Sequence, residues 1–527
     1  MTDLEGAALD ADRNVTDEPA PSGPGQRDTA KQIRGSSLLL VGRFISMGVN
    51  FVVQVLIVGH LAKSDYGAFA LALSMVTLGS MLVTFGLDRG ASRFLAVYDE
   101  QGDYDRLFGT LLMVGGTILS LGLALILLVV GLQGSLLGLL IGDPQAIAIF
   151  VILIALAPIE AADQLFGGTL AVFASARSIF LRKYVIGPGF RLVVVLLLVF
   201  GDFGVEFLAA GYVVSGAVGV AIYAGILWTV LGNRGIRSHL RFSTVKVPFR
   251  EILIFTLPLL STDLVYIAMN TSDAVILGHY WGTEAVAELR AVQPLAGLNA
   301  VVFSSFTLLY MPAASRMFAR KDNEGVADLY WRTAIWMAVF SFPIFAVTTS
   351  LAGPVTETLY GDRYAASATY LALLSFGYYF NAALGFNGLT LRVFGLIRYT
   401  VAINLTTAVA NLAMNLTLIP RYGALGAAIA TASTMVLHNI LKQAGLRRGT
   451  GIDLFAKQYL RVYVVVAVAT GLLGLVQVVV HPPLWVGLPL AALASLVVVL
   501  ANRRLLQVHE TFPELLKLPL MRRLLGA

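Results

Sequence analysis

The chain has 527 residues, of which 57% are hydrophobic and 13% are charged, and its mean hydropathy is +0.79. A soluble domain has about 45–50% apolar and about 25% charged residues, so the composition excludes a soluble globular protein. The absence of cysteine excludes disulfides, thiolate metal sites and cysteine catalysis. The net charge of +6 is dispersed over loops, which argues against nucleic-acid binding.

The polar segment 1–34 is rich in Asp, Pro and Gly, which predicts a disordered tail rather than a secretory signal. Apolar runs follow that can each cross about 30 Å of hydrocarbon as a helix. They are too long and too uniformly apolar to be strands of a barrel. Since lipid cannot satisfy backbone N–H and C=O groups, a membrane span that is not a barrel strand must be a helix. We predict an all-α polytopic membrane protein with about fourteen transmembrane helices, at 36–60, 66–86, 108–132, 146–173, 184–201, 205–231, 252–280, 285–311, 332–352, 366–391, 399–419, 422–441, 460–480 and 484–502.

A repeated segment predicts how these spans are organised. "SRFLAVYDEQGDYDRLF", from Ser92, follows span 2, and "SRMFARKDNEGVADLYW", from Ser315, follows span 8 with six matching residues in 17 positions. The even number of intervening spans indicates a parallel duplication. We therefore expect two pseudo-symmetric six-helix lobes, at 35–231 and 252–441, joined by a linker at 232–251. Two further helices at 460–502 and an amphipathic tail at 503–527 follow.

The distribution of basic residues predicts orientation. Of 37 Lys and Arg, we assign four to odd-numbered loops, Lys63, Arg290, Arg363 and Arg421, while Arg43 lies inside the first span. The remaining 32 fall in or beside the tails and the even-numbered loops. Because short cytoplasmic loops are rich in Lys and Arg, we expect a multi-pass protein of the cytoplasmic membrane with both termini cytoplasmic.

Four segments carry a resemblance to a known family: "LAKSDYGAFALALS" (61–74), "FTLPLLSTDLVYIAMNTSDAVILGHYWGTEAVA" (255–287), "YLALLSFGYYFNAALGFNGLTLRVFG" (370–395) and "NLAMNLTLIPRYGALGAAIATASTMVLHN" (411–439). They lie in the same order in the polysaccharide flippase branch of the multidrug/oligosaccharidyl-lipid/polysaccharide exporter superfamily, which includes O-antigen and teichoic-acid-type exporters. The chain resembles that branch over residues 33–445.

The resemblance implies two lobes in a V around a central cavity. It implies alternating access that moves a polyprenyl-linked (phosphate or pyrophosphate) oligosaccharide across the membrane for cell-surface polysaccharide synthesis. Membrane lipids, and glycosyltransferases or a polymerase of the same pathway, are the expected partners. We expect a transporter without a cofactor rather than an enzyme. The alternatives are a multidrug or cation antiporter of the same superfamily, or a membrane-embedded glycosyltransferase.

Charges inside spans are costly and usually functional, and they give the candidate substrate pathway. Arg43, Arg191 and Arg392 are candidates for binding an anionic phosphate. Each has a structural alternative: Arg43 can snorkel to the headgroups, Arg191 can anchor at the interface, and Arg392 can mark topology. Asn381 and Asn387 are candidate sugar contacts, although hydrogen bonding between helices is the ordinary use of such amides.

Acidic residues complete the candidates. Asp263 and Asp273 lie in span 7, where either can pair with a cation or take part in a proton or sodium step; for Asp273 the pairing alternative is a cation in the other lobe. Glu160 and Asp163 share a face of span 4 and can couple an ion, or pair with Arg177 or another nearby Arg. Neither a Gly-Lys pair nor HExxH occurs. The Asp103-Tyr104-Asp105 triplet predicts a solvated helix face rather than a metal–nucleotide site.

Overall fold

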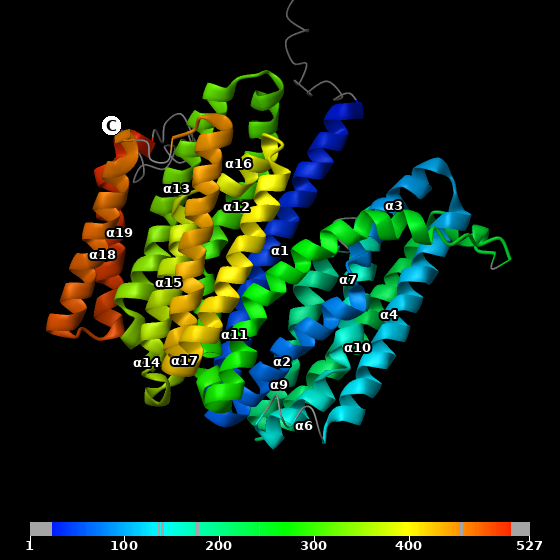
Figure 1. Ribbon diagram of the computed structural model, residues 1–527, viewed down its shortest axis with the longest axis horizontal. Helices are drawn as coiled ribbons and strands as arrows, with labels where there is room; N and C mark the ends of the chain where they lie inside the picture. The colour runs from blue at the N-terminus through cyan, green and yellow to red at the C-terminus, as the bar shows by residue number, and fades with distance from the viewer. Residues whose placement is uncertain are drawn as a thin grey trace, which may run out of the picture.

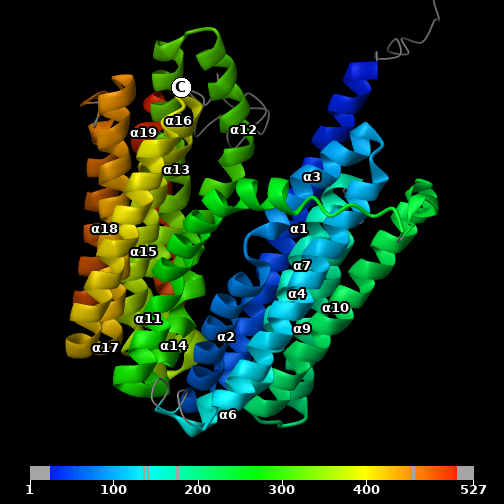
Figure 2. The same cartoon turned by 45° about the vertical axis from the view of Figure 1, so that its right-hand side comes forward.

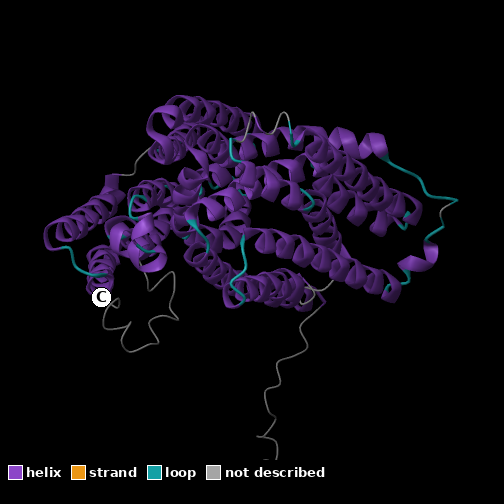
Figure 3. Ribbon diagram, turned by 90° about the horizontal axis from the view of Figure 1, so that it is seen from below, coloured by secondary structure: helices purple, strands orange, loops and turns teal. Residues whose placement is uncertain are grey.

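The computed structural model describes the backbone of residues 24–134, 138, 142–173, 179–241, 243–453 and 457–506. For 24–38, 40, 257–270, 304–305 and 308–309 it describes the backbone without the side chains. Within these ranges the chain folds into helices joined by short loops, and no strand is present (Figure 3). Of the predicted amphipathic tail 503–527, the part 507–527 lies outside the described residues.

The first half of the chain forms one lobe, on the right in Figure 1. A π-helical turn, η1, leads directly into α9. The helices are α1 (Pro24–His60), α2 (Lys63–Thr84), α3 (Leu87–Gln101), α4 (Tyr104–Leu132), α6 (Pro144–Leu153), α7 (Leu156–Phe173), η1 (Leu181–Ile186), α9 (Gly187–Phe200) and α10 (Val205–Asn233).

The second half forms the other lobe, with α18 and α19 packed on its outer side against α13 (Figure 1). Its helices and short turns are α11 (Phe249–Gly297), α12 (Asn299–Ala319), α13 (Asn323–Ser350), α14 (Ala352–Tyr360), η3 (Asp362–Tyr364), α15 (Ser367–Ala383), α16 (Asn387–Val393), α17 (Ile397–Thr450), η4 (Lys457–Tyr459), α18 (Leu460–Val480) and α19 (Leu484–Leu506). The linker between the lobes carries the short turn η2 (Ile236–His239), which packs on α10 and α4 of the first lobe.

Two of these helices reverse direction at a glycine. Gly282 in α11 has φ 78° and Gly423 in α17 has φ 57°. Glycine adopts these left-handed angles without the steric cost that a Cβ brings. The Nε1 of Trp281 donates to the carbonyl of Ile419 at 2.8 Å, which joins the two reversals to each other. Each of these helices therefore consists of two arms.

The all-α multi-pass class is confirmed. Ten helices of the described residues are long and apolar enough to span a membrane, and one of the ten, Ile397–Thr450, contains both arms of α17. The predicted total of about fourteen spans goes beyond this number and stays a prediction.

Two predicted boundaries differ from the structure. α1 begins at Pro24, inside the predicted tail. The predicted span at 146–173 agrees with a candidate membrane span at Pro144–Phe173, which is interrupted between α6 and α7, where Pro158 has no N–H to donate to the carbonyl of Ile154. The predicted span at 366–391 is interrupted at Gly385, where φ is 72° and an added Cβ would lie 2.8 Å from the Cβ of Ala334.

The two lobes contact each other at one end of the molecule and diverge towards the other (Figure 1, Figure 2). We call the end that carries Gly282 and Gly423 the turn end. The opposite end, which carries the segment 234–248, is the linker end. The start of α1 and the end of α19 also lie at the linker end (Figure 1).

Polar contacts join the lobes at the turn end. The Nζ of Lys63 on α2 donates to the Oε1 of Glu288 on α11 at 2.5 Å. The hydroxyl of Thr283 donates to Asp143 Oδ2 at 2.9 Å. The guanidinium of Arg363 donates to the carbonyls of Val58 and Gly59 in the last turn of α1 and to that of Leu61 just after it. A cation is favourable there because the C-terminus of a helix carries a partial negative charge. We call Lys63, Asp143, Thr283, Glu288 and Arg363 the junction.

The repeated segments adopt the same backbone geometry, but with a different alignment from the predicted one. α3 ends at Gly102 (φ 68°) and the carboxylate of Asp103 caps α4. α12 ends before Lys321 (φ 62°) and the carboxylate of Asp322 caps α13. Asp103 therefore corresponds to Asp322, about one helical turn away from the residue matches that indicated the repeat.

The carboxylates of the Asp103-Tyr104-Asp105 triplet form structural contacts. Asp103 Oδ1 accepts from the N–H of Arg106 at 3.1 Å. Asp105 Oδ1 accepts from the hydroxyl of Thr244 at 2.7 Å, which holds the linker against α4. Nearby, burial and a hydrogen bond to Glu251 raise the pKa of Tyr98 to about 12. Tyr98 therefore stays protonated and ties α3 to the start of α11.

We expect Gly67→Ala to destabilise the protein by about 1–3 kcal/mol, the usual cost of overpacking. An added Cβ at Gly67 would overlap the backbone carbonyl of Thr283, so α2 and α11 would have to separate. Gly48→Ala is the matched control, because nothing lies within 4 Å of a Cβ there. Thermal unfolding of the purified variants measures the difference; equal unfolding midpoints for the two would contradict the packing argument.

Candidate functional site

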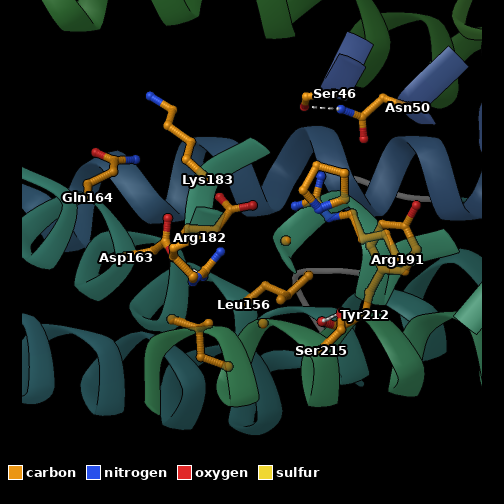
Figure 4. Close-up of a pocket in the computed structure, with 15 residues that line it drawn as sticks. Ser46, Asn50, Leu156, Asp163, Gln164, Arg182, Lys183, Arg191, Tyr212 and Ser215 are labelled. Carbon is orange, nitrogen blue, oxygen red and sulfur yellow. Dashed lines mark hydrogen bonds and ion pairs between the residues drawn. The ribbon is translucent and has the colours of Figure 1, made fainter. Parts of the chain in front are cut away.

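A cavity of about 400 Å³ lies inside the first lobe, between α1, α7, α9 with its π-helical turn, and α10. Polar side chains enter it from every one of these elements (Figure 4). We call it the first-lobe pocket. Its polar and charged lining residues are Ser46, Asn50, Glu160, Asp163, Gln164, Arg182, Lys183, Arg191, Tyr212 and Ser215.

Arg182 and Asp163 form an ion pair on one wall of this pocket (Figure 4). The Arg182 side chain is 8% exposed and that of Asp163 is 41% exposed. Nε of Arg182 also donates to the carbonyl of Gly219 at 2.9 Å, and its guanidinium lies 4.3 Å from the ring centre of Tyr223. Three contacts thus fix the guanidinium, and Gly219 provides the space for it because a Cβ there would overlap Arg182 Nη2.

The π-helical turn explains why the sequence did not reveal Arg182. Isolated π-helical turns within α-helical segments occur often at functional sites. Here the turn, Leu181–Ile186, places Arg182 and Lys183 in the wall of the pocket. In the sequence both residues precede the span predicted at 184–201, where basic residues ordinarily flank a membrane helix. The Leu-Arg-Lys-Tyr run before Gly187 and Pro188 was the available signal. Arg177, the other predicted partner for Asp163, lies outside the described residues.

Lys183 and Arg191 supply further positive charge. Both are exposed side chains, and neither has a carboxylate within ion-pair distance among the described residues. The guanidinium of Arg191 lies 5.4 Å from the ring centre of Tyr212. Because Asp163 is paired with Arg182, Glu160 is left to balance two cations. The pocket therefore favours an anion, and an Arg fork matches phosphate oxygens well.

The structure brings together three of the predicted site residues, Glu160, Asp163 and Arg191. Arg43 lies nearby: it is exposed on α1, and Ser46 and Asn50, three and seven residues further on, line the pocket. This spacing puts the three side chains on one face of α1. Arg43 is thus placed one helical turn from the pocket, towards the linker end.

We expect Arg43→Ala to reduce transport strongly and Arg43→Lys to keep part of it, because Lys retains the charge without the bidentate fork. Arg43→Gln is the control that removes charge and keeps a polar side chain. Transport measured at matched protein levels distinguishes the interpretations. If Arg43→Lys and Arg43→Gln are alike and only mildly impaired, Arg43 anchors in the headgroups instead.

The predicted partner of Asp273 was wrong. Asp273, which is 2% exposed, accepts from Arg290 Nη2 at 3.0 Å, and Arg290 lies in the second arm of the same helix α11. Arg290 was counted with an odd-numbered loop for the orientation, although it falls within the predicted span at 285–311; it lies inside a helix, with a side chain that is 15% exposed. The pair joins the two arms of α11 across Gly282, within the second lobe.

The remaining candidates lie in the second lobe, away from the first-lobe pocket. Asn439 Nδ2 donates to Asn381 Oδ1 at 2.9 Å, and Asn387 Nδ2 donates to Asn439 Oδ1 at 3.1 Å. These amides therefore link α15, α16 and α17. Arg392 is exposed in the last turn of α16. Asp263 lies in α11, but its side chain is outside the described residues.

Comparison with known proteins identifies the family. The family model described as "Polysaccharide biosynthesis protein" matches residues 33–318, more than half of the chain, and the model described as "MatE" matches residues 258–417. The chain is 21% identical to the stage V sporulation protein B of Bacillus subtilis, over 83% of this chain and 88% of that protein. It is also 21% identical to a putative O-antigen transporter of Shigella flexneri, over 44% of this chain and 55% of that protein.

Solved structures share the fold. The lipid II flippase MurJ in an inward closed conformation aligns with a TM-score of 0.69 and 13% identity, covering 89% of this chain and 100% of that one. An inward-facing multidrug resistance MATE family transporter aligns with a TM-score of 0.59 and 18% identity, covering 77% and 95%. The chain thus belongs to the polysaccharide biosynthesis protein family and to the polysaccharide flippase branch of the multidrug/oligosaccharidyl-lipid/polysaccharide exporter superfamily.

Proposed function

We propose that the protein moves an oligosaccharide linked to a polyprenyl phosphate or pyrophosphate across the cytoplasmic membrane, by alternating access, for the synthesis of a cell-surface polysaccharide. The observation that carries the proposal is the excess of positive charge in the first-lobe pocket, among membrane-spanning helices. Arg191 and Lys183 bind the phosphate oxygens, while Arg182 stays paired with Asp163. A buried cation in a membrane protein is stable only with such a partner.

The shape of the molecule supports the alternating-access part of the proposal. The lobes are held together at the turn end by the junction and diverge at the linker end (Figure 2). Water can replace the polar contacts of the junction when the lobes separate there, and the close packing of α2 on α11, as at Gly67, has to open with them. In the proposed cycle, substrate enters from the linker end, and the junction opens to release it at the turn end.

We propose that the linker end faces the cytoplasm, because Arg234, Arg237 and Arg241 lie there. A single cysteine introduced at Leu240 is then expected to resist a membrane-impermeant thiol reagent in intact cells and to react after the cells are opened. The native chain has no cysteine, so the background is low. Labelling of position 240 from outside intact cells would reverse the proposed orientation.

A multidrug or cation antiporter is the second candidate, because the "MatE" family model matches residues 258–417 and a multidrug transporter shares the fold. The charge of the first-lobe pocket separates the two. Arg182, Lys183 and Arg191 outnumber Glu160 and Asp163 there, which disfavours an organic cation. A lipid-linked anion is therefore the better match.

The proposal is tested in a strain from which the gene is deleted. We expect the lipid-linked saccharide to accumulate and the surface polysaccharide to decrease, and we expect the wild-type gene to reverse both changes. A Lys183→Gln/Arg191→Gln variant, present at wild-type levels, is expected to fail to reverse them. Unchanged amounts of lipid-linked saccharide in the deletion strain, or full activity of this variant, would contradict the proposal.

A further inference from the structure

A second basic cluster lies in the other lobe, at α16 and the second arm of α17. Arg392 is in the last turn of α16, and His438 and Lys442 are one turn apart on α17. The sequence contains neither Asp nor Glu between Asp362 and Asp453. Arg392 and Lys442 form no ion pair among the described residues.

In the part of the chain that the structure describes, the ammonium group of Lys442 has no hydrogen-bond acceptor or carboxylate partner. Lys442 is half-buried beside Gly388, where an added Cβ would lie 3.5 Å from Nζ. Arg392 lies close enough to repel it electrostatically. His438 Nε2 lies 3.0 Å from Asn404 Oδ1, which ties the second arm of α17 to the first. We call Gly388, Arg392, Asn404, His438 and Lys442 the cationic niche.

The cationic niche lies at the level expected for lipid headgroups. Lys442 follows Gly423, at the turn end, by nineteen residues. At 1.5 Å per residue this corresponds to about 28 Å along the helix axis, close to the thickness of the hydrocarbon layer of about 30 Å. The ammonium group of Lys442 is therefore near the headgroups on the side of the linker end.

An exposed apolar stripe leads away from the niche along the first arm of α17. Its residues recur at helical spacing on one face, and each is 40–62% exposed: Ile397, Val401, Leu405, Val409, Leu412 and Leu416. From Ile397 to Leu416 the stripe is about 28 Å long, enough to contact an acyl chain along its whole length. Charge and apolar surface are thus arranged to complement an amphiphile with an anionic head.

We propose that the cationic niche binds the phosphate headgroup of an anionic phospholipid, with the acyl chains along the stripe on α17. Two neighbouring cations without a carboxylate are costly at the edge of the membrane, and an anion between them removes this cost. A phosphate diester accepts hydrogen bonds from Lys and from the Arg fork at the same time. This site lies in a different lobe from the first-lobe pocket and does not depend on the proposed transport function.

The test is native mass spectrometry of the purified full-length protein titrated with phosphatidylglycerol, phosphatidylcholine or polyprenyl phosphate. Arg392→Gln/Lys442→Gln is expected to bind phosphatidylglycerol about thirtyfold more weakly, because each charge near a membrane surface contributes about fivefold. Its binding of phosphatidylcholine is expected to be unchanged. Arg447→Gln removes a charge at the same end of α17, outside the niche, and is expected to keep wild-type binding.

Gly388→Val keeps both charges and fills the space beside Lys442, so it tests the site even if the double variant does not fold. It is also expected to weaken phosphatidylglycerol binding. Three results would overturn the proposal: equal binding by Arg447→Gln and the niche variants, equal affinity of the wild type for phosphatidylcholine and phosphatidylglycerol, or tighter binding of polyprenyl phosphate than of phosphatidylglycerol. The last result would assign the niche to the transported substrate.

Discussion

Replacing Arg182 by leucine is expected to lower the free energy of unfolding by about 3 kcal/mol, the lower limit for breaking a buried ion pair by removal of one partner. The lower limit applies because the Asp163 side chain is 41% exposed and keeps part of its hydration. The variant also loses the hydrogen bond to the Gly219 carbonyl and the contact with the Tyr223 ring. The midpoint of thermal unfolding of the purified protein measures the effect.

Lys183→Leu is the matched control, because Lys183 is adjacent in the sequence, lines the same pocket and is exposed. It is expected to change the free energy of unfolding by about 0.5 kcal/mol or less. Arg182→Leu/Asp163→Leu is expected to recover part of the lost stability, since no unpaired charge is left behind. Equal and small effects of Arg182→Leu and Lys183→Leu would show that the ion pair does not hold this wall of the pocket.

Exchanging the charges of Lys63 and Glu288 is expected to have a large effect on the conformation of the lobes. Lys63→Glu places two carboxylates face to face at the junction and Glu288→Lys places two ammonium groups there, where both wild-type side chains are about 20% exposed. A repulsion on the order of 2 kcal/mol shifts a two-state equilibrium about thirtyfold. The variant with both changes restores the attraction and is expected to resemble the wild type.

Spin labels at introduced cysteines in positions 101 and 320 measure this shift, because both positions are exposed and end the equivalent helices α3 and α12 at the linker end. The native chain adds no label of its own. We expect a long distance in the wild type and in the double exchange, and a larger population at short distance in each single exchange. Identical distance distributions in all four proteins would show that the junction does not control the lobes.

Hydropathy predicted those parts of the fold that depend on length and apolar character alone. α4, α10, α18 and α19 lie where the sequence placed spans, since a helix in lipid needs only an apolar surface and satisfied backbone groups. The sequence did not reveal the interruption at Gly385, because it depends on how closely Ala334 packs there. The predicted alignment of the two repeated segments was wrong for a related reason. The structures correspond at a residue with left-handed backbone angles followed by an Asp that caps the next helix, and matching side chains did not reveal this.

The candidate site was predicted in part for similar reasons. Glu160 and Asp163 share one face of a helix by spacing alone, and Arg191 was noted as a charge inside a span. Arg182 was missed because a π-helical turn changes the direction of its side chain. Arg290 was missed as the partner of Asp273 because the sequence places a loop between the two arms of α11, where the structure has only the reversal at Gly282.

Translocation by the purified protein in liposomes tests the central claim most directly. A polyprenyl pyrophosphate-linked saccharide is incorporated, and the fraction that becomes accessible to a membrane-impermeant enzyme acting on the saccharide is followed over time. We expect faster translocation with the wild type than in protein-free liposomes, and a rate near the protein-free value with Lys183→Gln/Arg191→Gln at equal protein content. A wild-type rate equal to that of protein-free liposomes, in a preparation that unfolds cooperatively, would contradict the account.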